Sequence, residues 1–353
     1  MLLRSWLAVA LLAGAFLDQQ AQGSEPGEPN RPDTEVPPNL TSPTLGGKQL
    51  WSDELFFHGW RIQRNFLTKH CRLLDDKDQR QAWGTFEQCL EHLDRFKAER
   101  KLPPMRGKVV IVIHGMFRTS FSMKTLCATL REKGDFEVLP VDYPSTRGSV
   151  ADHAKSVASI VEHLGPEVEE IDFVAHSLGN LVIRYYLGDQ TSPATGRKPD
   201  PRIRRIVMLA PPNHAPQRAR LWADNAMFSS LYHFVLPETG NHLAAGFAEL
   251  EPRLAIPACE FGILAGGKGD GQGWHSGLDG DDDGTVTVEE TRLAGACDFA
   301  VLPVRHTFIM NDAKSLEYTL RFLESGCFVS DAERKPIVAV VKTTEAKAGE
   351  KTP

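Results

Sequence analysis

The chain has 353 residues, of which 41% are hydrophobic and 24% are charged. These shares are near the globular average and exclude a wholly disordered or fibrous protein. The formal net charge is −6, so the chain lacks the basic footprint of a nucleic-acid binder, and we expect no nucleic-acid partner. Six cysteines are too few for a disulfide scaffold but permit individual bridges in a secreted protein. The length suits one large domain with an appendage.

The N-terminal segment predicts an export signal over residues 1–23. Arg4 supplies a positive start, and an apolar run of 13 residues follows from Ser5 to Leu17. Small residues at 21–23 offer a cleavage site. Because a membrane-spanning helix needs about 20 apolar residues, the run favours a cleaved signal. The expected location is therefore secreted or periplasmic, and the alternative is an uncleaved signal that anchors the chain.

Two further segments lack the apolar content of a core. Residues 24–47 are rich in Pro, Gly, Glu, Ser and Asn and predict a disordered linker, which carries a glycosylation sequon at Asn39. Residues 331–353 predict a C-terminal segment with a disordered tail.

Residues 48–103 are expected to form a helical N-terminal extension packed on the main domain. The spacing of Trp83, Phe86, Leu90 and Leu93 indicates an amphipathic helix. An aromatic stripe of this kind is typical of a core face. The segment lies outside the pattern of the main body described next.

Two cysteines, Cys71 and Cys89, lie in this same segment. Their proximity in the sequence suggests a bridge between them, although six cysteines allow 15 full pairings. Two free buried thiols are the alternative.

Residues 104–330 alternate between predicted strands and predicted helices. The first strand is a continuous run of β-branched residues, typical of a strand buried on both faces. Alternation of this kind predicts an α/β domain with a mostly parallel sheet that is covered by helices on both faces. In chain order, strands are expected at 108–113, 136–141, 171–175, 203–210, 260–264 and 299–304, and helices at 119–133, 149–164, 178–187 and 313–324.

Residues 214–256 interrupt this alternation with an insertion rich in Leu, Trp, Met and Phe. An apolar insertion after a sheet strand predicts a lid or the wall of a binding pocket. An ordinary pair of packing helices is the alternative.

The sharpest chemical signal is the pentapeptide 175–179 (AHSLG), which follows a strand and opens a helix. A strand-to-helix turn this tight places the Ser177 side chain at the C-terminal edge of the sheet. Small residues at Ala175 and Gly179 let the strand and the helix approach. The backbone N–H of Leu178 lies at a helix start, where it can stabilise an oxyanion. Ser177 is therefore the candidate nucleophile.

A second signal, residues 114–116 (HGM), follows the first buried strand at a point where the chain must turn. These two signals in this order resemble the α/β-hydrolase superfamily, especially bacterial lipases and esterases with an Ala-x-Ser-x-Gly motif. Residues 141–145 (VDYPS) and 209–214 (LAPPNH) match further pieces, although the two prolines of the second piece depart from the usual Thr-Pro-Asn-His. The resemblance covers residues 107–325 and implies the α/β-hydrolase fold.

The resemblance implies a serine, an acid and a histidine in that chain order. His306 follows the last expected strand and is the implied base, with His275 as a weaker alternative. The loop after the first strand is implied to supply a second oxyanion donor. We assign that donor to the backbone amide of Met116, with Phe117 as the next candidate.

The acid is implied within residues 279–286 (DGDDDGTV). Relatives commonly carry it in an Asp-Gly-x-Val stretch, which selects Asp283, and its carboxylate would orient the histidine. Asp281 and Asp282 are alternatives, and Asp142 is a more remote one.

The same acidic run fits the calcium loop of an EF-hand. Asp279, Asp281, Asp283 and Glu290 occupy loop positions 1, 3, 5 and 12, with glycine at position 6. An EF-hand needs a helix that enters the loop, and the preceding residues 266–277 are half glycine, which disfavours a helix. A structural calcium site is therefore the lesser expectation.

These observations predict an exported serine hydrolase that acts on carboxylic esters through an acyl-enzyme and needs no cofactor. The expected partner is a small-molecule or lipid ester, with contact to a lipid surface as a further expectation. Two other classes remain open. One is a calcium-stabilised binding module that uses the loop from Asp279 to Glu290. The other is a hydrolase-fold binding protein without catalysis.

Overall fold

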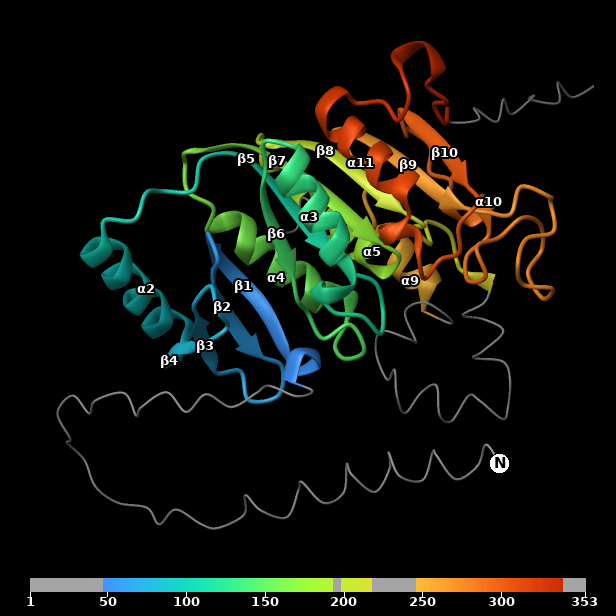
Figure 1. Ribbon diagram of the computed structural model, residues 1–353. Helices are drawn as coiled ribbons and strands as arrows, with labels where there is room; N and C mark the ends of the chain where they lie inside the picture. The colour runs from blue at the N-terminus through green and yellow to red at the C-terminus, as the bar shows by residue number, and fades with distance from the viewer. Residues whose placement is uncertain (1–46, 193–197, 218–245, 339–353) are drawn as a thin grey trace, which may run out of the picture. The chain divides into compact units, whose positions relative to one another are not determined.

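A six-stranded sheet forms the centre of the main domain (Figure 1). All neighbouring strands pair in parallel. The strands lie where the sequence predicts them, so the expected mostly parallel sheet is confirmed. In spatial order they are β10 (Asp298–Leu302), β9 (Glu260–Gly266), β8 (Ile203–Leu209), β7 (Val168–His176), β5 (Gly107–Ile113) and β6 (Glu137–Val141).

The computed structural model describes residues 47–192, 198–217 and 246–338. The expected export signal, nearly all of the expected linker, most of the insertion at 214–256 and most of the C-terminal tail lie outside these residues. Within the described ranges, every helix is too short or too polar to span a membrane.

Helices cover both faces of the parallel sheet, as the sequence predicts. Alternate residues of β5 point to opposite faces and join two separate buried clusters. This burial on both sides explains why β5 is a continuous run of β-branched residues and not an alternating one. The covering helices are α4 (Val150–Glu162) and α5 (Leu178–Thr191) on one face, and α3 (Lys124–Lys133) and α11 (Ala313–Ser325) on the other.

Residues 51–84 form a second sheet, which differs from the helical extension that the sequence suggests. Four antiparallel strands follow one another as a meander, in the order β1-β2-β3-β4. The helix is confirmed except at its start: α2 (Phe86–Arg100) begins after a capping box between Thr85 and Gln88. Trp83, expected on its buried face, lies on the last strand of this sheet and is 52% exposed. The strands are β1 (Trp51–Phe57), β2 (Trp60–Asn65), β3 (Cys71–Leu74) and β4 (Arg80–Gly84), preceded by the short 3-10 helix η1 (Gly47–Leu50).

The strands of this N-terminal sheet are short and irregularly paired, which hides them from a pattern search. The register shifts between Asp53 and Leu55 and again between Leu73 and Leu74. Each shift breaks the period-two alternation by which a strand is recognised. Buried side chains of the sheet nevertheless join the same cluster as α4 and α5, so the sheet is part of the core of the domain.

All six cysteines are free. Cys71 lies on β3 and Cys89 on α2, both are buried, and the bridge expected between them is not formed. Burial raises the pKa of the Cys71 thiol to about 12 and that of the Cys89 thiol to about 11. Both side chains therefore behave as small apolar core residues.

Candidate active site

Ser177 stands in a strained turn between β7 and α5. Its φ is 51° and its ψ is −122°, a conformation that residues other than glycine rarely adopt. Its backbone N–H donates to the carbonyl oxygen of Leu209 at 2.9 Å, which fixes the turn against β8. A Cβ atom at Gly179 would lie 2.9 Å from the carbonyl oxygens of Ile113 and His114. Glycine at this position therefore lets α5 begin close to β5.

His306 lies in the loop after β10, and its ring reaches Ser177. The Nε2 atom is 2.9 Å from Ser177 Oγ, and the Nδ1 atom is 2.7 Å from Asp283 Oδ2. Asp283 is 1% exposed and His306 is 9% exposed, so this chain of hydrogen bonds is largely shielded from water. With Asp283 ionised, Nδ1–H donates to the carboxylate, and Nε2 accepts the hydroxyl hydrogen of Ser177. The structure thus brings together the three residues selected from the sequence.

The Asp283 carboxylate is held by the backbone around it. Its Oδ1 atom accepts the N–H groups of Thr285 at 2.9 Å and Val286 at 2.8 Å. The His306 N–H donates to the Asp283 carbonyl oxygen at 2.9 Å. These bonds aim Oδ2 at the imidazole and fix the distance between the two loops.

The alternative acids and the alternative base form hydrogen bonds outside the Ser177–His306 pair. Asp281 and Asp282 each accept backbone N–H groups of the glycine-rich loop that precedes them. His275 belongs to that loop, and its backbone N–H is one of the donors to Asp282. Asp142, at the end of β6, is bound to the N-terminal sheet and to the segment after β5.

Three side chains of the calcium-loop alternative likewise bind separate partners and do not converge on one point. Asp283 faces the histidine, and Asp281 holds the glycine-rich loop. Glu290 accepts the N–H of Thr287 at 2.9 Å in the capping box of the short helix α10 (Val288–Thr291). Across the ranges that the structure describes, no group of three or more His, Cys, Asp or Glu side chains is placed to hold a metal ion.

The loop after β5 lies directly against the Ser177 turn. A Cβ atom at Gly115 would be 2.7 Å from Nδ1 of His176 and 3.1 Å from Cβ of Ser177. Because a side chain at this position would collide with the turn, glycine is what allows the loop to approach Ser177.

The two backbone amides assigned to the oxyanion from the sequence lie in the two segments that meet at Ser177. Leu178 is the first residue of α5, where a backbone N–H has no partner within the helix. Met116 follows Gly115 and packs half-buried against the core. Phe117, the next candidate, has φ 61° and is 52% exposed.

His176 is a residue of this site that the motifs do not single out. Its Nε2 atom is 3.0 Å from the carbonyl oxygen of His306. Burial holds the pKa of His176 well below its usual value, and the neighbouring His306, when protonated, and Arg118 lower that pKa further. The His176 ring is therefore neutral, and its Nε2–H ties the Ser177 turn to the His306 loop. Its partner lies 130 residues away, so the sequence offers no signal beyond its place beside Ser177.

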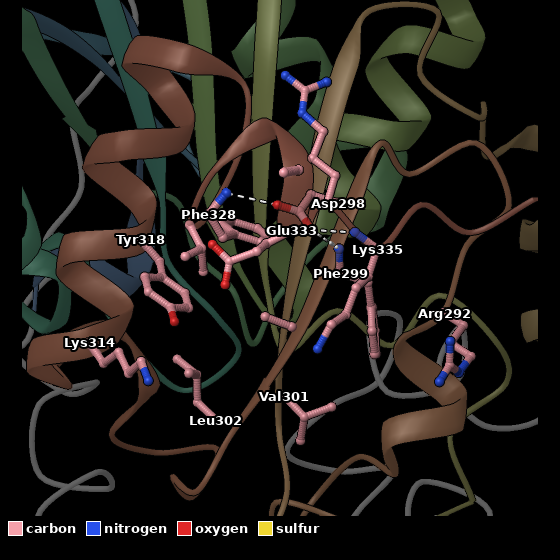
Figure 2. A pocket seen from close by; sticks show the side chains of 14 residues that line it. Arg292, Asp298, Phe299, Val301, Leu302, Lys314, Tyr318, Phe328, Glu333 and Lys335 are labelled. Carbon is pink, nitrogen blue, oxygen red and sulfur yellow. Dashed lines mark hydrogen bonds between the residues drawn. The ribbon is translucent and has the colours of Figure 1, made fainter.

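A cavity of about 720 Å³ lies elsewhere, beside β10 and α11 (Figure 2). Its walls come from these two elements, from Arg292 and from residues 328–335. Its buried carboxylate, Asp298, accepts three backbone N–H groups at 2.7 to 3.0 Å. The side chains of the Ser177 site do not line this cavity, so the two are separate.

The parallel strand order, the turn that carries Ser177 after β7, and the later chain positions of Asp283 and His306 define the α/β-hydrolase fold. The resemblance drawn from the sequence is thereby confirmed at the level of the fold. A family model described as "Domain of unknown function (DUF7379)" matches residues 73–235. No curated protein matches the sequence.

Several solved structures of hydrolases are similar to this chain. Lipase BlEst2 of Bacillus licheniformis, in its mature form, is 18% identical, with a TM-score of 0.41 over 63% of this chain and 91% of that chain. Est1E of Butyrivibrio proteoclasticus, with ferulic acid bound, is 16% identical, with a TM-score of 0.42 over 63% and 88%. The hydrolase olei00960 of Oleispira antarctica is 15% identical, with a TM-score of 0.40 over 63% and 93%.

Proposed function

We propose that this chain is a serine hydrolase that cleaves carboxylic esters through an acyl-enzyme. The observation that carries the proposal is the pair of hydrogen bonds from His306, 2.9 Å to Ser177 Oγ and 2.7 Å to Asp283 Oδ2. The three residues have the types, the chain order and the spacing that nucleophilic catalysis by serine requires.

The proposed reaction begins when Ser177 Oγ attacks the ester carbonyl carbon and His306 Nε2 takes the hydroxyl proton. The carbonyl oxygen becomes an oxyanion, which the amides of Met116 and Leu178 stabilise. The intermediate collapses as His306 returns the proton to the departing alcohol, and an ester bond to Ser177 remains. Water then attacks the acyl carbon as His306 takes its proton, His306 returns that proton to Ser177 Oγ as the acyl bond breaks, and the acid is released. Asp283 stabilises the imidazolium in both halves.

Three features support this assignment beyond the hydrogen bonds. The Ser177 turn is strained, as expected of a site held ready for reaction. The loop that would supply the second amide is packed against the turn. His176 is kept neutral beside the base, so it adds no charge that would oppose the imidazolium. The proposed place of action, outside the cytoplasm, rests on the sequence of residues 1–23.

The test compares hydrolysis of p-nitrophenyl butyrate by the wild-type chain, by Ser177→Ala and by Ser325→Ala. Ser325, at the end of α11, is a matched serine far from the proposed chemistry. We expect Ser177→Ala to lose about a millionfold in rate and Ser325→Ala to lose none. Covalent labelling with a fluorophosphonate should follow the same pattern.

Equal rates in all three proteins would overturn the assignment of Ser177. A wild-type chain that is labelled at Ser177 but leaves the ester intact would rule out this ester as the substrate and leave the assignment as a serine hydrolase standing. Amides and thioesters would then be the next substrates to test. A wild-type chain that is neither labelled nor active would support a hydrolase-fold binding protein instead.

A further inference from the structure

The oxyanion loop, residues 114–120 after β5, is bound at its far end from two sides. Beyond Phe117, the Arg118 carbonyl oxygen accepts a hydrogen bond from Nε2 of Gln49 at 2.6 Å. Two residues further on, the Ser120 N–H donates to Asp142 Oδ1 at 2.7 Å. Gln49 belongs to η1, directly before the N-terminal sheet, and Asp142 follows β6. The end of the loop is therefore fixed by groups from outside the loop itself.

Asp142 is in turn bound to the first strand of the N-terminal sheet. The Asp53 N–H donates to the Asp142 carbonyl oxygen at 2.9 Å, and the Asp142 N–H donates to Asp53 Oδ2 at 2.6 Å. Gln63 of β2 fixes the other oxygen of Asp53 at 2.7 Å. Both carboxylates are at most 1% exposed. The contact is thus a buried, reciprocal lock between β1 and the end of β6.

The beginning of the loop is held by the same stretch of chain. The Tyr143 hydroxyl, one residue after Asp142, donates to the carbonyl oxygen of His114 at 2.7 Å. The Tyr143 and His114 rings stack with their centroids 4.3 Å apart. Both ends of the loop from His114 to Ser120 therefore depend on where residues 142–143 lie.

We propose that the N-terminal sheet positions the oxyanion loop of this enzyme, with Gln49 and Asp53 as positioning residues that act through Arg118 and Asp142. This inference rests on the proposed function. The physical reason is that an oxyanion donor works only within a few tenths of an ångström of its place. A loop whose far end is released lets Met116 move, and a displacement of about 1 Å can cost roughly 100-fold in rate.

Gln49 is the residue at which this can be tested with least damage to the core. It is half-buried, its Nε2 makes one bond to the loop, and its Oε1 accepts from Thr146 Oγ1 at 3.3 Å. Gln49→Glu keeps the length and removes the donor, and Gln49→Met removes both polar atoms. Gln81 of β4 provides matched controls, since its Nε2 donates to Oδ2 of Asp75, in the turn between β3 and β4, at 2.7 Å. Gln81→Glu and Gln81→Met should disturb the sheet without touching the loop.

The measurements are kcat and KM for p-nitrophenyl butyrate, the melting temperature, and the inhibition constant of a trifluoromethyl ketone, which mimics the oxyanion. We expect both Gln49 variants to lose about 10- to 100-fold in kcat with little change in KM. The ketone should bind more weakly by the same factor as kcat/KM falls. The Gln81 variants should keep the wild-type kcat at comparable melting temperatures.

Unchanged kcat in both Gln49 variants would overturn the proposal, and so would equal kcat losses in the Gln49 and Gln81 variants. Either result would leave the sheet with a role in stability alone. Wild type and Ser177→Ala are run alongside, so that the two proposals can fail separately. An active, Ser177-dependent wild type with insensitive Gln49 variants contradicts only the positioning role. An inactive wild type overturns the proposed function and this inference with it.

Discussion

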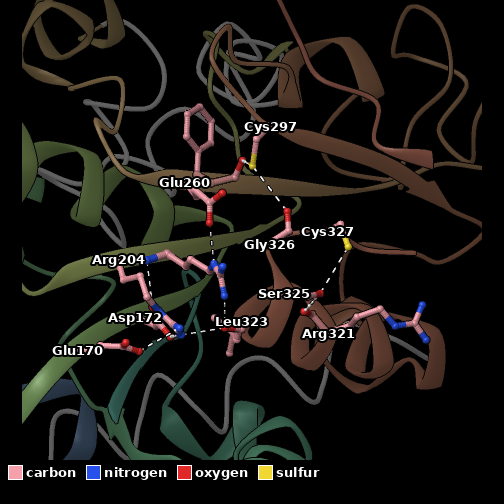
Figure 3. A network of polar contacts seen from close by, with 12 residues as sticks. Glu170, Asp172, Arg204, Glu260, Cys297, Arg321, Leu323, Ser325, Gly326 and Cys327 are labelled. Carbon is pink, nitrogen blue, oxygen red and sulfur yellow. Dashed lines mark hydrogen bonds and ion pairs between the residues drawn. The ribbon is translucent and has the colours of Figure 1, made fainter. Parts of the chain in front are cut away.

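The two edges of the parallel sheet each bury a carboxylate, and each carboxylate has a different partner. At the carboxyl edge, Asp283 faces the His306 ring at 2.7 Å. At the amino edge, Asp172 of β7 is 0% exposed and binds the guanidinium of Arg204 and the backbone N–H of Arg205. Figure 3 shows Asp172 and Arg204 next to the carbonyl oxygen of Leu323, which also accepts from Arg204 at 2.8 Å.

The difference lies in what each partner can do with a proton. Arginine stays charged throughout the accessible pH range, so the Asp172 pair is a fixed ion pair that holds α11 to the sheet. The Asp283 pair instead holds an imidazole whose other nitrogen faces Ser177, and we propose that this imidazole carries a proton during the reaction. One sheet therefore carries a stabilising network towards the amino ends of its strands and the proposed catalytic residues beyond their carboxyl ends.

The largest expected effect comes from Asp283→Asn. The amide keeps the shape of the carboxylate but favours the wrong imidazole tautomer, as in other serine triads. We expect kcat for p-nitrophenyl butyrate to fall about 10⁴-fold, while the urea midpoint of unfolding changes little. Steady-state kinetics and urea denaturation, measured on the same preparation, check the two halves of this prediction.

Asp281→Asn is the matched control for that experiment, since Asp281 lies two residues away and binds the glycine-rich loop. Its kcat should stay within a few-fold of wild type. A larger loss in Asp281→Asn than in Asp283→Asn would mean that the acid has been assigned to the wrong member of the run.

The two sheets also differ in how well the sequence predicts them. The parallel strands could be recognised because burial on both faces produces continuous apolar runs, and Ser177 because its turn requires small neighbours. His306 and Asp283 followed from chain order through the resemblance. The strands of the antiparallel sheet hold no such run, because polar side chains such as Asp53 and Gln63 are buried among them, and two register shifts break their alternation.

Contacts between distant residues were the other part that the sequence could not supply. The Asp53–Asp142 lock joins residues 89 positions apart, and no local pattern marks either one as a partner of the other. The sequence offers Asp142 as an alternative acid because it directly follows a sheet strand. This position places it at the carboxyl ends of the strands, where the acid is expected. Its actual role depends on a segment whose fold the pattern did not reveal.

At the amino edge, Asp172→Ala should destabilise the fold without affecting the chemistry. The substitution removes the buried acceptor that the Arg204 guanidinium shares with the Arg205 N–H. Arg204 is 23% exposed and keeps Glu170 and the Leu323 carbonyl oxygen as partners. The loss of unfolding free energy should therefore lie at the lower end of the range for a broken buried ion pair, at about 3 kcal/mol. Urea denaturation should show this loss, and kcat measured well below the melting temperature should equal that of wild type.

Glu260 tests whether burial is the cause of that loss. Its carboxylate pairs with Arg205 at 2.7 Å in the same network but is 44% exposed. Glu260→Ala should therefore cost only about 0–1 kcal/mol. Equal losses of unfolding free energy in the two variants would contradict the contrast between buried and exposed ion pairs. A fall in kcat for Asp172→Ala would mean that the Asp172 network also affects the chemistry.

The smallest expected effect concerns Asp53 of β1, whose buried carboxylate has a raised pKa. Burial raises the pKa of Asp53 from 3.8 to about 6; Asp142 adds to the rise, whereas Arg61 opposes it. Arg72 of β3 also interacts with this carboxylate. An acid with a raised pKa holds its proton longer in the folded state than in the unfolded state. Its contribution to stability is therefore lost as pH rises from about 4 to about 6.

The comparison of wild type with Asp53→Asn measures this contribution together with its coupling to Asp142, because the carboxylates that do not interact with Asp53 titrate alike in both proteins. The shift of about two pKa units corresponds to roughly 3 kcal/mol. The unfolding free energy of wild type minus that of the variant should thus fall by about 2–3 kcal/mol between pH 4 and pH 7, measured by urea denaturation. A flat difference would mean that Arg61 keeps Asp53 ionised throughout this pH range. The contribution of Asp53 to stability would then be that of a permanently charged carboxylate and would not depend on pH.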